Sequence, residues 1–388
     1  MRSIIIKYSA LALALATGLS SCTKDFTERN TNPATYSQSN FDPNYILTTA
    51  QLNYTGSQDF SYETWRGNLI YCATMMQGLS TVVGYWAGDK YLLNEGYTAA
   101  YWDKAYPDQV KGVVDLVEFT KDKPQYKNLY QIARIMKAMI LERVTDLYGD
   151  VPYFSAGQGY YSNELFPVYD KQQEIYSDLL KEVEEATNAL DVAGDKPAGD
   201  AIYGGNIGKW QMFGNSLLLR MAMRLTKIDP VTAQAYATKV LGKTLTSNAD
   251  NAFLKHDATG GRTTINRNSQ VLIGDGGQEH YYVKWSQTFI DFLKTSDDPR
   301  LGKVAVTNLY LSDASKDQNA GFNATPAAQK GMPNGKDLSG IPGRTIGSDP
   351  TFTTFPDYSS PHPGMIKRDG VTFILTYAQT ELLLADAA

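Results

Sequence analysis

Residues 126–153 read YKNLYQIARIMKAMILERVTDLYGDVPY, and this segment predicts the central element of the fold. Its apolar residues recur at alternating spacings of three and four, a helix-face pattern sustained for about five turns. This face comprises Leu129, Ile132, Ala133, Met136, Met139, Ile140, Val144 and Leu147. Three further apolar residues, Ile135, Ala138 and Leu141, widen the face, so we expect the helix to be buried on more than one side.

Local signals predict both ends of this helix. Pro124 suits the start, because its missing N–H would be unpaired there. Gly149 is expected to cap the carboxyl end in a left-handed conformation, and Pro152 prevents continuation. At about 1.5 Å per residue the helix spans roughly 35 Å. A helix this long and this apolar requires other helices around it.

The rest of the first 250 residues predicts more helices. Helical spacing appears in residues 45–54, 62–79, 102–121 (bent near Pro107), 175–190, 210–225 and 230–241. Asp170 and Gln173 predict a capping box before the fourth of these, and Asp229-Pro230 starts the last. The helices pair like tetratricopeptide hairpins, but their starts lie too far apart for a tandem array with a period of about 34 residues. We therefore expect an all-α fold of irregular TPR-like hairpins.

After about Thr244 the pattern changes to long loops, which we expect to be functional insertions or disordered segments. The loops are 251–282 and 312–364, rich in Gly, Asn, Asp, Thr and Pro. A helix is predicted at 285–294, a short strand at 371–375 and a helix at 376–388.

The first 22 residues predict an export signal. Arg2 and Lys7 precede an apolar run of about a dozen residues, too short to span a bilayer. The run ends Leu19-Ser-Ser-Cys22, which resembles a bacterial lipobox, so Cys22 is expected to carry a lipid. The alternative is an ordinary signal peptide with a chance cysteine. The other cysteine, Cys72, is expected to be a small buried side chain.

Composition and motifs argue against several function classes. The net charge is −5 and no run of Lys or Arg occurs, so we expect no nucleic-acid partner. Two Cys and three His without zinc spacing predict no metal site, and we expect the histidines to be solvated in loops. Gly242-Lys-Thr lacks the preceding glycine of a phosphate-binding loop. A pair of catalytic carboxylates stays open, because such pairs are neighbours in space rather than in sequence.

An aromatic, glycine-rich loop at 80–101 is the candidate ligand site. Rings can stack on the apolar faces of a sugar or peptide while short polar side chains hydrogen-bond to it. The candidate contacts are Tyr85, Trp86, Tyr91, Asn94 and Tyr97, with Trp86 first because its ring is the largest. The equally weighted alternative is a loop that its own aromatic residues pin to the core.

Several phrases, in order along the chain, resemble the SusD/RagB family. They are LYGDVPY at 147–153, IYSDLL at 175–180, DDPRL at 297–301 and YAQTELLLADAA at 377–388. The last resembles a helix that begins the final repeat of the family. The resemblance therefore implies a signal peptide at 1–22 and one SusD-like α-helical domain at 23–388, incomplete at its carboxyl end.

The resemblance also implies a function. SusD/RagB proteins are outer-membrane lipoproteins that face the cell surface and pass nutrients to a SusC-like TonB-dependent transporter. A family member would bind an oligosaccharide, without catalysis and without a cofactor. A peptide receptor of the RagB type is the alternative among binding proteins, and a surface glycan hydrolase is the alternative among enzymes.

Overall fold

The predicted central helix is α7 (Lys127–Tyr148) in the computed structural model, which describes residues 41–56, 63–259, 264–274, 277–314 and 321–388. Along α7 the predicted face from Leu129 to Val144 is fully buried, as are Ile135, Ala138 and Leu141. Leu147, in the last turn, is 46% exposed, so the buried face ends one turn early. The prediction that α7 is buried on more than one side is confirmed.

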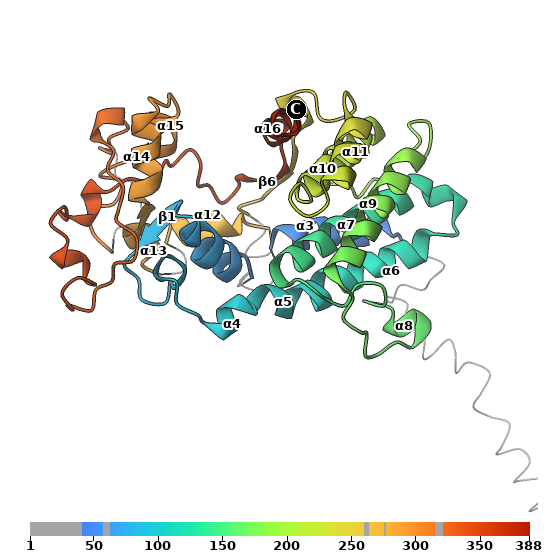
Figure 1. The fold of residues 1–388 in the computed structure, drawn as a ribbon, viewed down its shortest axis with the longest axis horizontal. Helices are drawn as coiled ribbons and strands as arrows, with labels where there is room; N and C mark the ends of the chain where they lie inside the picture. Colours follow the sequence, from blue (N-terminus) through green and yellow to red (C-terminus); the bar gives the residue numbers. More distant parts are fainter. Residues whose placement is uncertain (1–40, 57–62, 260–263, 275–276, 315–320) are drawn as a thin grey trace, which may run out of the picture. The chain divides into compact units, whose positions relative to one another are not determined.

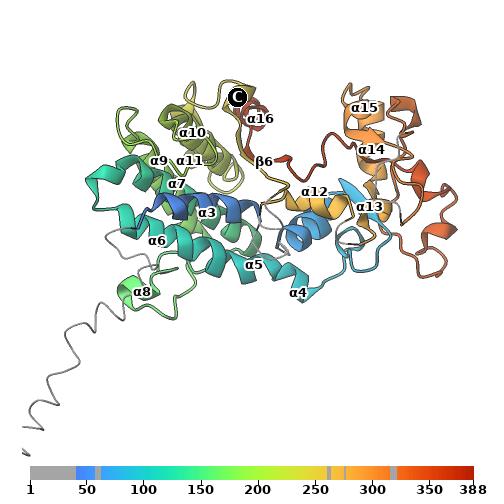
Figure 2. The same ribbon diagram turned by 180° about the vertical axis from the view of Figure 1, so that it is seen from behind.

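Four helices surround α7 and bury it. They are α3 (Asn44–Thr55), α6 (Lys111–Thr120), α9 (Gln172–Ala189) and α10 (Ile207–Met223), and α10 in turn packs against α11 (Pro230–Val240). Figures 1 and 2 show these helices side by side from opposite directions. All of them belong to one compact unit, residues 44–388. The all-α prediction is confirmed.

Two π-helices interrupt the regular pattern in the described residues, and the first one changes which side chains of the predicted helix at 62–79 are buried. Residues Glu63–Ala73 form the π-helix η1, in which each turn takes up more residues than in an α-helix. Leu69 and Ile70 are therefore buried, whereas Cys72 is exposed, so the prediction of a buried Cys72 is wrong. The irregularity expected at Pro107 is the π-helix η3 (Ala105–Val110), between α5 (Ala100–Lys104) and α6.

The corner after α7 joins it to α9. Gly149 has φ +76° and ψ −122°, so its φ is positive as predicted, but its ψ lies outside the left-handed helical region. Asp150 then accepts a hydrogen bond from the backbone N–H of Gln172 at 3.0 Å. The predicted capping box at Asp170 is absent, because the Asp170 carboxylate instead accepts from the N–H groups of Tyr153 and Phe154 at 2.9 and 3.0 Å.

Three short antiparallel pairs join segments that lie far apart in the sequence. Strand β1 (Leu79–Thr81) pairs with β3 (Val283–Trp285), β2 (Ala252–Lys255) with β6 (Val371–Leu375), and β4 (Ala305–Val306) with β5 (Ser360–Pro361). The strand predicted at 371–375 is confirmed. His256 and His280 are only 5% and 1% exposed, so the expectation of solvated histidines is wrong for both. His256 Nε2 lies 2.8 Å from the Thr372 hydroxyl of β6.

The remaining α-helices that the structure describes have six residues or fewer, apart from α14 and α16. They are α4 (Glu95–Thr98), α8 (Gly159–Ser162), α12 (Arg267–Leu272), α13 (Glu279–Tyr282), α14 (Gln287–Thr295), α15 (Leu301–Val304) and α16 (Tyr377–Ala387). The predicted helices at 285–294 and 376–388 correspond to α14 and α16. The cap of α11 is also as predicted, since Asp229 accepts from the N–H of Thr232 at 3.1 Å.

Candidate functional site

The aromatic loop is held in place by a buried charge pair. The side chains of Asp89 and Lys90 are 0% and 9% exposed, and Lys90 Nζ lies 2.8 Å from Asp89 Oδ1. Lys90 also donates to the carbonyls of Thr81 and Trp86 at 2.9 and 3.1 Å. Thr81 belongs to β1, and β1 pairs with β3, so the base of the loop is held in place.

Trp86, the first-choice ligand contact, is in the core. It is 0% exposed and packs with Leu69, Ile70, Leu79, Val83, Val271 and Val283. The chain passes so close behind it that a Cβ at Gly88 would lie 2.2 Å from the Ile70 carbonyl oxygen. Trp86 therefore offers no ring face to a ligand in this conformation. Its burial agrees with the alternative reading, in which the loop's own aromatic residues pin it to the core.

Tyr85 is only partly available to a ligand, because its hydroxyl is hydrogen-bonded within the protein. It is 36% exposed and donates a hydrogen bond to Oε1 of Glu279, a fully buried carboxylate on α13. Burial and then the hydrogen bond to Glu279 raise the pKa of the Tyr85 hydroxyl, so it stays a donor at neutral pH. Its ring meets the Trp65 ring edge-on, with centroids 6.1 Å apart.

Tyr91 is the most exposed of the predicted contacts, at 64%. It adopts a left-handed backbone conformation (φ 52°, ψ 34°), and its hydroxyl donates to the Met75 carbonyl at 3.3 Å. Leu92 and Leu93, which follow Tyr91 in the sequence, are exposed. Met75, to which Tyr91 is hydrogen-bonded, and the adjacent Met76 are exposed as well. The structure thus presents Tyr91 within an apolar surface.

Asn94 and Tyr97 are engaged in holding the end of the loop. Asn94 caps α4, since its side-chain oxygen accepts from the N–H of Tyr97 at 3.2 Å. The guanidinium carbon of Arg66 lies 4.6 Å from the centroid of the Tyr97 ring. Tyr97 also packs against the cluster that contains Trp86, so the structure brings these two residues together.

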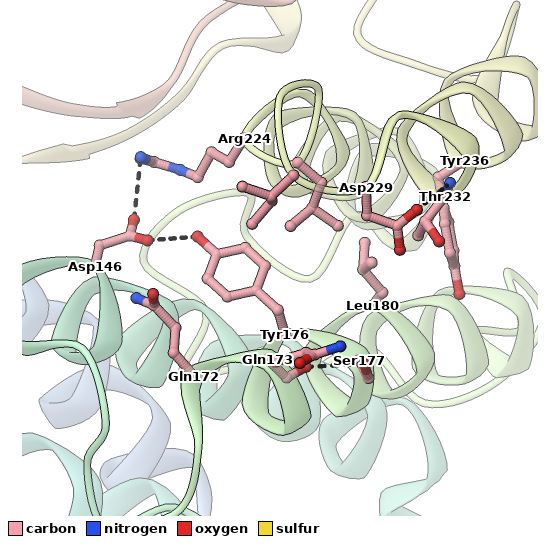
Figure 3. A pocket seen from close by; sticks show the side chains of 12 residues that line it. Asp146, Gln172, Gln173, Tyr176, Ser177, Leu180, Arg224, Asp229, Thr232 and Tyr236 are labelled. Atoms are coloured by element: carbon pink, nitrogen blue, oxygen red, sulfur yellow. Dashed lines mark hydrogen bonds and ion pairs between the residues drawn. The ribbon is translucent and has the colours of Figure 1, made fainter.

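Two cavities lie elsewhere, and neither was predicted from the sequence. The first, about 690 Å³, is lined by residues of α9, of the turn between α10 and α11 (residues 224–229) and of α11, and by Asp146 of α7 (Figure 3). Arg224 and Tyr176 both point toward the Asp146 carboxylate, with Arg224 Nη2 at 3.1 Å and the Tyr176 hydroxyl donating a hydrogen bond. Burial raises the pKa of Asp146, but both of its oxygens are already partnered, so the groove has no unpaired acid at this point.

The second cavity, about 670 Å³, is lined by residues of two separate segments, 102–115 and 152–167. Trp102, Tyr106 and Tyr160 contribute aromatic rings. No local sequence pattern indicates this cavity, because its two walls are at least 37 residues apart in the chain and meet only in the folded protein.

Comparison with known families places the chain. Residues 36–388 match the model of a SusD-like family described as "Starch-binding associating with outer membrane". The chain belongs to this SusD-like family. No curated protein sequence matches it significantly. The prediction from the sequence phrases is confirmed.

Solved structures of SusD-like proteins share the fold. A chitin-binding protein is 29% identical, with a TM-score of 0.73, over 89% of this chain and 70% of that one. A Bacteroidetes SusD-like protein is 24% identical, with a TM-score of 0.73, over 89% and 72%. A SusD homologue from Bacteroides vulgatus is 21% identical, with a TM-score of 0.69, over 89% and 65%. The irregular TPR-like architecture is thus that of known SusD-like folds.

The described residues of this SusD-like chain contain neither a membrane-spanning helix nor a cluster of metal ligands. No helix there is long and apolar enough to cross a membrane. No group of three His, Cys, Asp or Glu side chains there is placed to hold a metal ion. Cys22, the predicted lipidation site, lies outside the described residues.

Proposed function

We propose that this SusD-like chain binds an oligosaccharide at the outer membrane and passes it on without cleaving it. The observation that supports this most is the family match across residues 36–388, since the family is described as starch-binding. The similarity to a chitin-binding protein makes a β-linked N-acetylglucosamine oligosaccharide the first ligand to test. A starch-derived oligosaccharide is the second.

The proposed ligand site is the exposed side of the 80–101 loop, with Tyr91 as its main ring and Tyr85, Asn94 and Tyr97 around it. Tyr91 supports this proposal because most of its ring is exposed on a loop with a buried ion pair at its base. A pre-ordered ring loses little freedom when a sugar stacks on it. Trp86 supports the site from behind rather than touching the ligand.

Anchoring and delivery complete the proposed function. The apolar run before Leu19-Ser-Ser-Cys22 supports lipid attachment at Cys22, which would hold the protein at the outer membrane. Family membership supports a SusC-like TonB-dependent transporter as the partner that receives the ligand.

A peptide ligand is the second candidate, and one observation favours it. The residues around Tyr91 include exposed Met75, Met76, Leu92 and Leu93. Flexible methionine and leucine side chains suit the varied apolar groups of a peptide better than the hydroxyl-rich edge of a sugar. A peptide would therefore use the same face of the loop.

Calorimetric titration of the protein with chitin tetrasaccharide, maltotetraose and a leucine-rich peptide tests the proposal. We expect a saccharide to bind, and Tyr91→Ala to weaken binding about tenfold without changing the melting curve. Tyr45→Ala is the matched control, because Tyr45 is 60% exposed on α3 and lies outside the loop. Binding of the peptide alone would select the second candidate, and release of shorter sugars during incubation would contradict a purely binding role.

A further inference from the structure

The second cavity has the composition of a saccharide site. We call it the aromatic cleft and define it by Trp102, Tyr106 and Tyr160 with the charged residues Asp103, Lys111 and Glu164. Its volume of about 670 Å³ falls within the range of small-ligand pockets, about 300–1,000 Å³. It shares no residue with the 80–101 loop.

One wall of the aromatic cleft is rigid. The Trp102 ring packs between those of Tyr106, at 4.9 Å, and Tyr169, which is nearly parallel to it at 5.9 Å. The Tyr106 hydroxyl donates to the Pro152 carbonyl at 2.9 Å, which fixes the wall to the corner after α7. Because these rings are held before any ligand arrives, little conformational entropy is lost on binding.

The other wall presents an open ring. Tyr160, on α8, is 84% exposed, and Tyr161 meets it edge-on with centroids 5.3 Å apart. Tyr161 is itself tied to α6, since its hydroxyl donates to Asp115 Oδ1 at 3.0 Å. The turn before α8 needs Gly157, whose φ is +74° and whose added Cβ would lie 3.1 Å from Val114. The exposed Tyr160 ring is therefore positioned by its surroundings.

Charged groups surround the rings. Asp103, Lys111 and Glu164 are exposed, and in the part of the chain that the structure describes none of them has a side-chain hydrogen bond or ion pair. The carboxylates can accept hydrogen bonds from sugar hydroxyls, and the Lys111 ammonium can donate to hydroxyl or ring oxygens. The aromatic rings therefore suit the apolar face of a pyranose, and the charged groups around them suit its hydroxyl-bearing edge.

A protein partner fits the aromatic cleft less well. The centres of protein interfaces are depleted of charged residues, whereas four charged residues line this cleft, namely Asp103, Lys111, Asp115 and Glu164. The cleft is also concave, whereas the other exposed apolar residues of the same segment, such as Phe166 and Val168, do not line it.

We propose that the aromatic cleft is a second oligosaccharide-binding site, in which a pyranose ring stacks on Tyr160 and its hydroxyls bond to Asp103, Lys111 and Glu164. The ligand class rests on the proposed function. Two sites on one chain strengthen the binding of a long polysaccharide, because once one site is occupied the other meets a high local concentration of sugar units.

Four proteins test this, all titrated with chitin tetrasaccharide and with maltotetraose. They are the wild type and the variants Tyr160→Ala, Tyr160→Phe and Phe166→Ala. For Tyr160→Ala we expect the affinity of one of the two binding sites to fall about tenfold or more. Tyr160→Phe keeps the ring and should bind like the wild type. Phe166 is 88% exposed in the same segment but outside the cleft, so Phe166→Ala is the matched control.

The outcomes separate the two proposals. If the wild type binds and Tyr160→Ala binds equally well, the second site is overturned and the proposed function stands. If the Phe166→Ala variant loses as much affinity as Tyr160→Ala, general surface adhesion replaces the cleft. If the wild type binds neither saccharide, the proposed function fails and the cleft loses its ligand class. Melting curves of all four proteins establish that each is folded, which a surface position for both side chains predicts.

Discussion

Asp150 caps a helix that begins 22 residues after it. Its Oδ1 accepts a hydrogen bond from the backbone N–H of Gln172 at 3.0 Å, and its Oδ2 lies 2.6 Å from Lys171 Nζ. The hydrogen bond and ion pair with Lys171, and then the Gln172 N–H, lower the pKa of Asp150. The Tyr-Gly-Asp-Val-Pro corner therefore ends one long helix and starts the next, which locks α7 and α9 at one end.

Removal of this cap should lower stability. We expect Asp150→Ala to reduce the melting temperature by roughly a few degrees, because the Gln172 N–H at the start of α9 loses its acceptor. Asp150→Asn keeps an acceptor oxygen and should retain most of the stability. Thermal unfolding followed by circular dichroism measures both, and equal losses in the two variants would show that the ion pair with Lys171 matters more than the cap.

Gly149 should tolerate no side chain, for conformational reasons alone. An added Cβ there meets no atom within 4 Å, so crowding is not the issue, but φ is +76° with ψ at −122°. We expect Gly149→Val to destabilise by roughly 1–3 kcal/mol in urea unfolding.

Gly112 provides the contrast for Gly149. It lies in α6, its added Cβ also meets nothing within 4 Å, and its φ is in the ordinary range. Gly112→Ala should be neutral or stabilising by up to about 1 kcal/mol, since alanine favours the helix. An unchanged stability for both variants would contradict the conformational account of the corner.

The buried Glu142–Arg220 pair should be sensitive to loss of either partner. The Glu142 side chain is 2% exposed and Arg220 is 11% exposed, and Arg220 Nε donates to Glu142 Oε1 at 3.2 Å. Arg220→Met should cost roughly 3–5 kcal/mol, because it leaves a buried carboxylate with less compensation. The double variant Glu142→Leu/Arg220→Met should recover part of this loss, and a double variant less stable than the single one would contradict the expectation.

Lys284 should make stability depend on pH in the alkaline range. Burial lowers the pKa of Lys284 to about 7, and its Nζ donates to the Ser360 hydroxyl at 2.9 Å. In the unfolded chain the pKa is about 10.4, so between about pH 10 and pH 7 the unfolded state binds more protons. Above about pH 10 burial of Lys284 therefore does not reduce the free energy of unfolding. As the pH drops from 10 toward 7, this free energy falls by about 1.4 kcal/mol for each pH unit.

The Lys284→Met variant tests this dependence. It should remove the slope between pH 10 and 7 and be more stable than the wild type at about pH 7. Lys294→Met, at an exposed position of α14, should leave the slope unchanged. Urea unfolding at several pH values gives the comparison, and the same slope in Lys284→Met and wild type would exclude Lys284 as its source.

Cys22→Ser should release the protein from the membrane. The acyl chains attached to Cys22 would contribute about 0.8 kcal/mol for each buried CH₂ group, and a serine cannot carry them by a thioether. We expect the wild type to incorporate palmitate label and the variant to leave the membrane fraction. Cys72→Ser, at the only other cysteine, is the control and should keep both the label and the membrane association.

Features set by neighbours along the chain were predictable from the sequence. The spacing of apolar residues identified α7, α9 and α10, and Asp229-Pro230 identified the start of α11. The alternation of residues 371–375 identified strand β6. Each of these depends on contacts a few residues apart, which is the range over which helix periodicity, capping and strand alternation act.

Features set by residues far apart required the tertiary structure. The sequence suggested an exposed role for Trp86, but its ring is buried because η1 and β3 close over it, at positions that no local pattern specifies. Asp150, and not Asp170, is the acceptor at the start of α9, because the Asp170 carboxylate accepts from the N–H groups of Tyr153 and Phe154 instead. The aromatic cleft likewise exists only where the segment after Pro152 returns to Trp102. Amino-acid order determined the helices, whereas long-range packing decided which aromatic rings were left exposed to a ligand.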